Sequence, residues 1–233
     1  MSTNPSNTDR SNAGRIGGHI LVDCLRAHGV DLAFAVPGES YLAVLDGLVD
    51  APEIRTIVCR QEGGAAMMAE AYGKLTGKPG ICMVTRGPGA TNASAGVHVA
   101  FQDSTPMILL VGQVGRDMFD REAFQELDYR RMYGQLAKWV AQIDDPARIP
   151  EYVSRAFHTA VSGRPGPVVL ALPEDMLVER ASVADFDPYK RTEPHPGAAD
   201  IARFREILAA AKRPLVVVGG GGWDAETSAA LAR

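Results

Sequence analysis

Runs of apolar residues alternate along the chain with stretches of helical periodicity. Near-continuous apolar runs separated by helices are typical of parallel strands that are buried on both faces. We therefore predict an α/β fold, a parallel sheet with helices on both faces, whose ligands gather at the carboxyl ends of the strands. Strands are expected at 33–36, 54–58, 80–84, 107–111 and 168–171, and helices at about 41–49, 63–76, 90–101 and 146–162.

The pattern divides the chain into four parts. Residues 1–14 are polar and are predicted to be disordered, and residues 15–182 form the α/β domain. Residues 183–197 hold three prolines and no apolar period, which is typical of a linker. Residues 198–233 are expected to begin a second α/β domain, with a helix at 198–211, a strand at 214–218 and a glycine turn at 219–222. One strand and two helices cannot close a core, so we expect a fragment of a longer protein.

Composition narrows the classes of function. Hydrophobic residues make up 46% of the chain and the formal net charge is -4, so a nucleic-acid or anionic-membrane partner is not expected. The chain lacks a membrane-length apolar run and the apolar core of a signal peptide, which favours a cytoplasmic protein. The spacing of Cys24, Cys59 and Cys82 predicts reduced thiols and no metal site. The adjacent Met67 and Met68 are expected in the core.

Three predicted strands end in unusual residues, VPGES at 36–40, RQEGGAA at 60–66 and TRGPGATN at 85–92. Glu62 has two interpretations from its position alone. It is a helix N-terminal acid that the helix dipole favours, or a carboxyl in an apolar crevice that exchanges a proton with a ligand nitrogen. The Gly87-Pro88-Gly89 turn is a poor phosphate cradle, because Pro88 removes a donor and no dinucleotide or Walker motif follows.

Taken in order, these motifs resemble the pyrimidine-binding domain of the acetolactate synthase large-subunit family, which depends on thiamine diphosphate. The resemblance includes RQEGGAAMMAEAYG at 60–73, GPGATN at 87–92 and DSTPM at 103–107. Further matches are AFQE at 123–126, Lys138-Trp139 and GRPGPV at 163–168. It covers residues 17–179, and residues 214–222 resemble the opening of the same enzymes' middle domain. It implies a flavodoxin-like fold.

The resemblance also implies roles for single residues. Glu62 matches the glutamate that shares a proton with the aminopyrimidine ring and so promotes loss of the thiazolium proton. Phe124 and Gln125 match a pair near the reacting carbon and the substrate. Lys138 matches a basic residue that faces the substrate channel, or is a solvated surface lysine. Arg164 matches a flavin-contacting arginine, so FAD is possible, or belongs to a structural turn. The expected lining of the pyrimidine pocket is Pro37, Gly38, Pro88, Gly89 and Asn92.

Some positions depart from the family pattern. Gln61 stands where many relatives have His, Glu39 where many have a second Gly, and Arg86 replaces a common small residue. Each departure changes polarity beside the pocket, so the 2-oxo acid accepted is open. The Gly-Asp-Gly stretch and later Asn that hold Mg²⁺ and the diphosphate in the family's C-terminal domain are absent.

The implied activity is the joining or decarboxylation of 2-oxo acids, most like two pyruvates giving 2-acetolactate and CO₂. The family also implies a homodimer or homotetramer with the site between subunits. The alternatives are a 2-oxo acid decarboxylase, a benzaldehyde lyase-like enzyme, and a non-catalytic interaction module.

Overall fold

The computed structural model describes residues 14–184, 187–219 and 223–233. Its centre is a six-stranded, wholly parallel sheet with the strand order β3-β2-β4-β5-β7-β6. The predicted α/β fold is confirmed, and all five predicted strands of the sheet are present. The strands are β2 (Leu32–Ala35), β3 (Arg55–Val58), β4 (Gly80–Val84), β5 (Met107–Gln113), β6 (Trp139–Gln142) and β7 (Pro167–Pro173).

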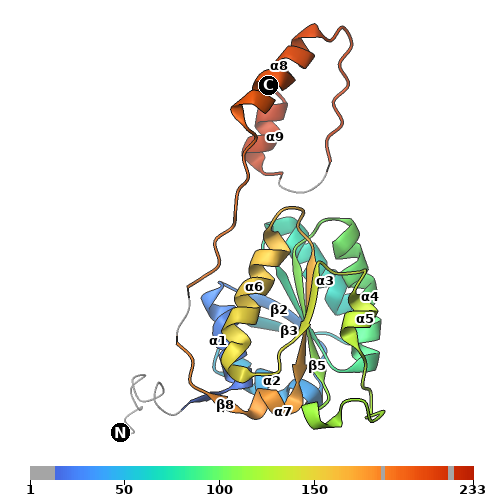
Figure 1. The fold of residues 1–233 in the computed structure, drawn as a ribbon, viewed down its shortest axis with the longest axis vertical. Coiled ribbons are helices and arrows are strands. Elements are labelled where there is room, and N and C mark those ends of the chain that lie inside the picture. The colour runs from blue at the N-terminus through green and yellow to red at the C-terminus, as the bar shows by residue number, and fades with distance from the viewer. Residues whose placement is uncertain (1–13, 185–186, 220–222) are drawn as a thin grey trace.

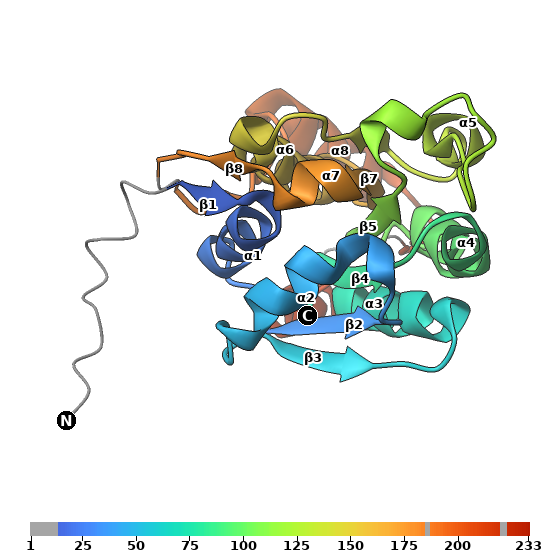
Figure 2. The same ribbon diagram turned by 90° about the horizontal axis from the view of Figure 1, so that it is seen from below.

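Helices cover both faces of this sheet, as Figures 1 and 2 show. One face packs against α1 (Gly17–Ala27), α2 (Leu42–Val49), α6 (Ile149–Val161) and α7 (Glu174–Val178). The other packs against α3 (Glu62–Thr76), α4 (Gly87–Gln102) and α5 (Tyr129–Tyr133). Every residue of β4, β5 and β7 is buried, which explains their unbroken apolar sequences.

The short elements complete the domain. A two-stranded antiparallel pair, β1 (Arg15–Ile16) with β8 (Arg180–Ala181), ties its two ends together. The 3₁₀ helices η2 (Glu39–Tyr41), η3 (Arg116–Met118) and η4 (Pro146–Arg148) lie in the connections between the described strands and helices. The sequence patterns had not indicated α1, α5, α7, β1, β6 or β8.

Helices α3 and α4 pack closely through small residues. A Cβ atom on Gly96 would lie 2.5 Å from the Cβ of Ala66, so the approach of the two helices requires glycine there. The expectation that Met67 and Met68 are core residues is wrong, because each residue is 39% exposed. Alanines fill the buried seam instead, since only small side chains allow backbones this close.

The C-terminal part lies apart from the sheet (Figure 1). The predicted helix is confirmed as α8 (Ala198–Ala210), and α9 (Ala225–Leu231) follows. The predicted strand at 214–218 is wrong: these residues have no regular structure and are exposed. A strand needs a neighbour to satisfy its backbone groups, and no described strand lies beside this one. The predictions for residues 1–13, for 185–186 of the linker and for 220–222 lie outside the described residues.

Candidate functional site

The carboxyl edge of the sheet brings together the segments that follow β2, β3 and β4. The chain runs from β2 outward to β3 and then back past β2 to β4, so the sheet has its topological switch point between β2 and β4. Ligands of open α/β sheets bind at such points. In this structure, the crevice between the ends of β2 and β4 is occupied by residues of the chain itself. A Cβ on Gly38 would lie 2.5 Å from Thr85, and Ser40 Oγ lies 2.8 Å from Thr85 Oγ1.

Glu62 lies beside this crevice, as the first residue of α3. The preceding Gln61 caps the helix, because its Oε1 accepts a hydrogen bond of 2.7 Å from the Gly64 N–H. Glu62 is therefore a first-turn acid that the helix dipole favours. Its side chain is half-buried, which is intermediate between a solvated helix acid and a carboxyl enclosed in an apolar crevice.

The first turns of α4 face Glu62. Asn92 Nδ2 donates to Glu62 Oε2 at 3.0 Å, and a Cβ on Gly89 would lie 3.5 Å from Glu62 Oε1. The predicted turn at 87–89 is in fact the first turn of α4, where Pro88 is tolerated because the amide it lacks has no helical partner. The structure thus brings Glu62, Gly89 and Asn92 together, with the exposed Pro88 at the rim.

Phe124 and Gln125 reach the same edge from the loop after β5. The Gly87 N–H donates to the carbonyl of Gln125 at 2.9 Å, which joins the loop to the start of α4. The Phe124 side chain is 74% exposed there. The exposed Pro37, with Gly38, belongs to the segment over the strand ends. Seven of the predicted residues therefore share one edge with Glu62: Pro37, Gly38, Pro88, Gly89, Asn92, Phe124 and Gln125.

Lys138 and Arg164 lie at the opposite, amino edge. Lys138 precedes β6, and its ammonium donates to the carbonyls of Thr159 and Ser162 at the end of α6. Burial lowers the pKa of this lysine. Arg164 precedes β7 and donates to Ser104 Oγ at 2.8 Å and to two carbonyls at the end of α4, those of Phe101 and Gln102, at 3.0 Å. Within one chain, both residues therefore lie away from Glu62, and the Arg164 side chain is engaged by Ser104 and the end of α4.

Comparison with known proteins identifies the family of this chain. The family model described as thiamine pyrophosphate enzyme, N-terminal TPP binding domain, matches residues 15–132, half of the chain. The chain belongs to the thiamine pyrophosphate enzyme family. This match begins at β1 and ends in α5, so it contains the whole carboxyl-edge cluster around Glu62. Thiamine pyrophosphate is the same molecule as thiamine diphosphate.

Relatives of this thiamine pyrophosphate enzyme domain are named acetolactate synthases. The chain is 37% identical over 229 residues to the acetolactate synthase of Arthrospira platensis, with 93% of this chain and 39% of the relative covered. It is 37% identical over 221 residues to the isozyme 2 large subunit of Escherichia coli, with 92% and 39% covered. Against the large subunit of Corynebacterium glutamicum it is 36% identical over 211 residues, with 88% and 33% covered. The chain thus spans about two-fifths or less of these relatives.

The described residues fit one part of the cofactor. A carboxylate with an amide beside it and glycines around it can pair with a flat, nitrogen-bearing ring such as an aminopyrimidine. They do not fit the metal-bound diphosphate, because no group of three or more His, Cys, Asp or Glu side chains in the described ranges could hold a metal ion. Also within those ranges, no helix is both long and apolar enough to cross a membrane.

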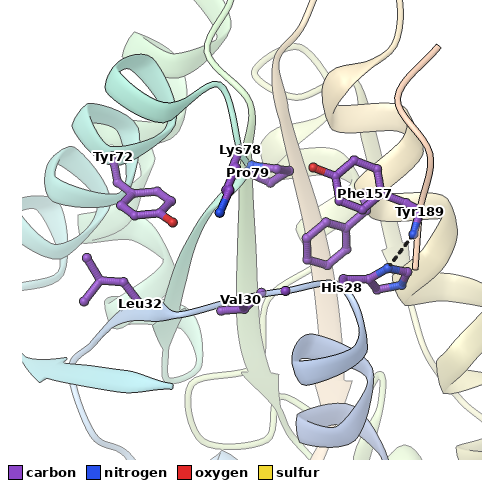
Figure 3. A pocket seen from close by; sticks show the side chains of 9 residues that line it. His28, Val30, Leu32, Tyr72, Lys78, Pro79, Phe157 and Tyr189 are labelled. Atoms are coloured by element: carbon purple, nitrogen blue, oxygen red, sulfur yellow. Dashed lines mark hydrogen bonds between the residues drawn. The ribbon is translucent and has the colours of Figure 1, made fainter. Parts of the chain in front are cut away.

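Glu62 lines neither of two cavities in the domain. One, of about 390 Å³, lies at the carboxyl edge between η2, η3 and α7, and includes Glu39 and Glu174 in its wall. The other, of about 150 Å³, lies at the amino edge among His28, Tyr72 and Tyr189 (Figure 3). Glu62 itself is half-exposed in the single chain.

Proposed function

We propose that this domain binds the aminopyrimidine ring of thiamine diphosphate through Glu62, in an enzyme that joins or decarboxylates 2-oxo acids. The activity proposed is most like that of acetolactate synthase, in which two pyruvates give 2-acetolactate and CO₂. One observation carries the proposal: a first-turn carboxylate held by Asn92 and bordered by Gly89 at the carboxyl edge of the sheet. The names of the relatives support the choice of substrate class.

The residues of this chain would bind and orient the ring. Glu62 Oε1 would share a proton with a ring nitrogen, while Asn92 holds Oε2 and so fixes the carboxylate plane. Gly89 lacks a side chain where a Cβ would lie 3.5 Å from Glu62 Oε1, so a flat ring could approach the carboxylate there. When bound, thiamine diphosphate would supply an electron sink for the negative charge that develops at the carbonyl carbon of the 2-oxo acid. Phe124 and Gln125, from the loop at the same edge, would contact the 2-oxo acid.

Other parts of the protein or another chain would complete the site. We propose that Mg²⁺ and the diphosphate are held outside the described residues, and that two or more copies form the active unit. The half-exposed position of Glu62 supports a site that closes against a second surface. FAD is not part of the proposal, because Arg164 is engaged by Ser104 and the end of α4.

The deciding experiment is Glu62→Gln in the full-length protein. Glutamine keeps the size and the hydrogen bond from Asn92 but cannot share a proton with a ring nitrogen, so the rate should fall about 100- to 10,000-fold with folding intact. The readout is acetolactate formed from pyruvate with Mg²⁺ and thiamine diphosphate. Glu151→Gln is a matched control, because Glu151 is also a first-turn acid, on α6, but is exposed and paired with Arg148.

The outcomes separate the interpretations of Glu62. Activity of Glu62→Gln within a few-fold of the parent would contradict its role with the cofactor and leave only the helix-dipole interpretation. Release of acetaldehyde without acetolactate by the parent protein would replace the synthase with a decarboxylase. The Glu151→Gln control should form acetolactate at the parental rate, so a loss of activity confined to Glu62→Gln is the result that supports the proposal.

A further inference from the structure

Two residues that depart from the family pattern, Glu39 and Arg86, contact one another at the carboxyl edge. Arg86 is the residue before α4, and its side chain is only 10% exposed. Its Nη2 donates to Glu39 Oε1 at 2.9 Å and to Glu174 Oε2 at 3.2 Å. The guanidinium thus joins the segment after β2 to the start of α7. The two departures compensate one another in charge, so they are best understood as one feature.

This guanidinium also lies against the loop that carries Phe124 and Gln125. Arg86 Nη1 lies 3.5 Å from the carbonyl oxygen of Phe124, a long and weak contact, and the next amide, of Gly87, donates to Gln125. A Cβ on Gly87 would lie 2.8 Å from that same Gln125 carbonyl, so the approach is as close as glycine permits. Arg86 and Gly87 together therefore fix the backbone of the loop at two successive carbonyls.

The loop needs such an external contact because its own backbone is strained. Three of its non-glycine residues adopt left-handed conformations, with φ of 59° at Asp120, 53° at Glu122 and 67° at Gln125. Such conformations persist only where the surroundings enforce them. The Glu126 carboxylate holds the middle of the loop by accepting from the amides of Asp120 and Ala123. At the Gln125 end, the enforcing contacts come from Arg86 and Gly87.

We propose that Arg86, held by Glu39 and Glu174, is a positioning residue that orders the Phe124–Gln125 loop over the site of Glu62. This inference rests on the proposed function for its catalytic consequence, but the ordering of the loop can be measured without it. Arginine suits the task because its planar fork can serve two carboxylates and a carbonyl at once, which the lysine ammonium does less well. The acids are partly exposed, at 71% for the Glu39 side chain and 43% for that of Glu174, so water can solvate them once Arg86 is removed.

Limited trypsin digestion of the full-length protein tests the ordering. Arg121 is exposed in the middle of the loop, and cleavage after it reports how often the loop opens. Arg86→Gln should raise the rate of this cleavage about tenfold, with a smaller rise in Glu39→Gln and partial rescue in Arg86→Lys. Arg26→Gln is the matched control, since Arg26 also pairs with a glutamate, Glu53, but lies at the end of α1, far from the loop.

Kinetics of the same variants test the catalytic consequence. Arg86→Gln and Glu39→Gln should raise KM for pyruvate more than they lower kcat, and should shift the preference between pyruvate and 2-oxobutyrate. A purely structural role would lower the amount of active enzyme and leave KM and preference unchanged. Thermal unfolding confirms that each variant is folded; if Arg86→Gln is not, Glu39→Gln alone decides.

The two proposals fail in different ways. Cleavage after Arg121 at the parent rate in a folded Arg86 or Glu39 variant overturns the positioning role, whatever the enzyme does. A parent protein that forms no product from pyruvate overturns the proposed function, while faster cleavage in the variants still supports the positioning role.

Discussion

Polar side chains at the two edges of the sheet have different kinds of partner. At the amino edge, Lys138 and Arg164 place their cationic groups on the last carbonyls of α6 and α4, and His28 accepts a hydrogen bond from the Tyr189 amide. At the carboxyl edge, Glu62 is held by one amide of Asn92, remains half-exposed, and has an oxygen facing Gly89. These polar groups at the amino edge are bonded within the chain, whereas Glu62 at the carboxyl edge remains accessible to a ligand.

This difference follows from helix polarity in a parallel sheet. Every helix that connects two strands begins at the carboxyl edge and ends at the amino edge. Helix N-termini therefore favour anions at the carboxyl edge, and helix C-termini favour cations at the amino edge. A lysine or arginine at the amino edge therefore meets helix carbonyls that need donors. An acid in the first turn of a helix at the carboxyl edge is favoured by the helix dipole: Glu174 pairs there with Arg86, whereas Glu62 accepts from the neutral amide of Asn92. The edge on which a residue falls decides between a structural and a functional interpretation more firmly than its type.

The largest expected change in the free energy of unfolding comes from His28, at the amino edge, when the pH is lowered. His28 is buried beside Phe157, with ring centroids 4.5 Å apart, and its Nδ1 accepts from the Tyr189 N–H at 3.0 Å. Burial, aided by the nearby His158, lowers the pKa of His28 from 6.5 to about 4. The folded state disfavours the charged imidazole. The contribution of neutral His28 to the free energy of unfolding is therefore complete above pH 6.5 and is lost as the pH falls towards 4. The loss should reach about 3 kcal/mol at most.

Urea unfolding at pH 7 and pH 4.5 measures this loss, with His28→Gln as the comparison. Glutamine can accept the Tyr189 hydrogen bond but does not titrate, so the free energy of unfolding of the variant should depend less steeply on pH. An unchanged difference between parent and variant at the two pH values would show that His28 does not sense pH. In that case, protonation of His28 would not limit the stability of the fold at acidic pH.

Lys138→Met gives the next largest effect. Methionine keeps the apolar stem that packs against Gly166 but removes the ammonium, and the carbonyls of Thr159 and Ser162 lose their charged donor. Charged hydrogen bonds of this kind contribute about 2 kcal/mol each, and partial exposure reduces the total, so we expect a loss of about 2 kcal/mol in the free energy of unfolding. Activity per folded molecule should not change, because Lys138 is at the edge opposite Glu62.

The exposed Lys212 provides the control, and Lys212→Met should leave stability unchanged. A Lys138→Met protein of parental stability with a raised KM for pyruvate would reverse our assignment. It would restore the substrate-channel role that the resemblance implied for this lysine.

Much of the fold could be predicted from the sequence because the central strands are apolar throughout. The strand β6 could not, since Trp-Val-Ala-Gln at 139–142 is short and ends in a polar residue, and its backbone pairs only with β7. That omission hid the position of Lys138, which precedes a strand and so belongs to the amino edge. For Arg164 the order along the chain was already sufficient, because it precedes the predicted strand at 168–171. The partnership of Glu39, Arg86 and Glu174 joins residues far apart in sequence, and only the folded chain shows it.

The smallest effect, at the carboxyl edge, tests how Glu62 is held. Gln61→Ala removes the side-chain cap of α3 and should lower the free energy of unfolding by about 1 kcal/mol, measured by urea unfolding. Gln61→Asn, with a shorter side chain that is a better cap in most helices, should restore most of this loss. In the full-length enzyme, Gln61→Ala should lower activity only a few-fold, because Asn92 still holds the carboxylate of Glu62.

The neighbouring glycine provides an independent test of the same cap. The Gln61 side chain folds over Gly63, where a Cβ would lie 3.0 Å from the Gln61 amide and 3.1 Å from the Asn92 carbonyl oxygen. In the parent protein, Gly63→Ala should displace the Gln61 side chain and lower the free energy of unfolding. In the Gln61→Ala background the decrease should be smaller, because the Gln61 amide no longer lies beside residue 63. An equal decrease in the free energy of unfolding in the two backgrounds would mean that the contact with α4, and not the cap, requires glycine at position 63.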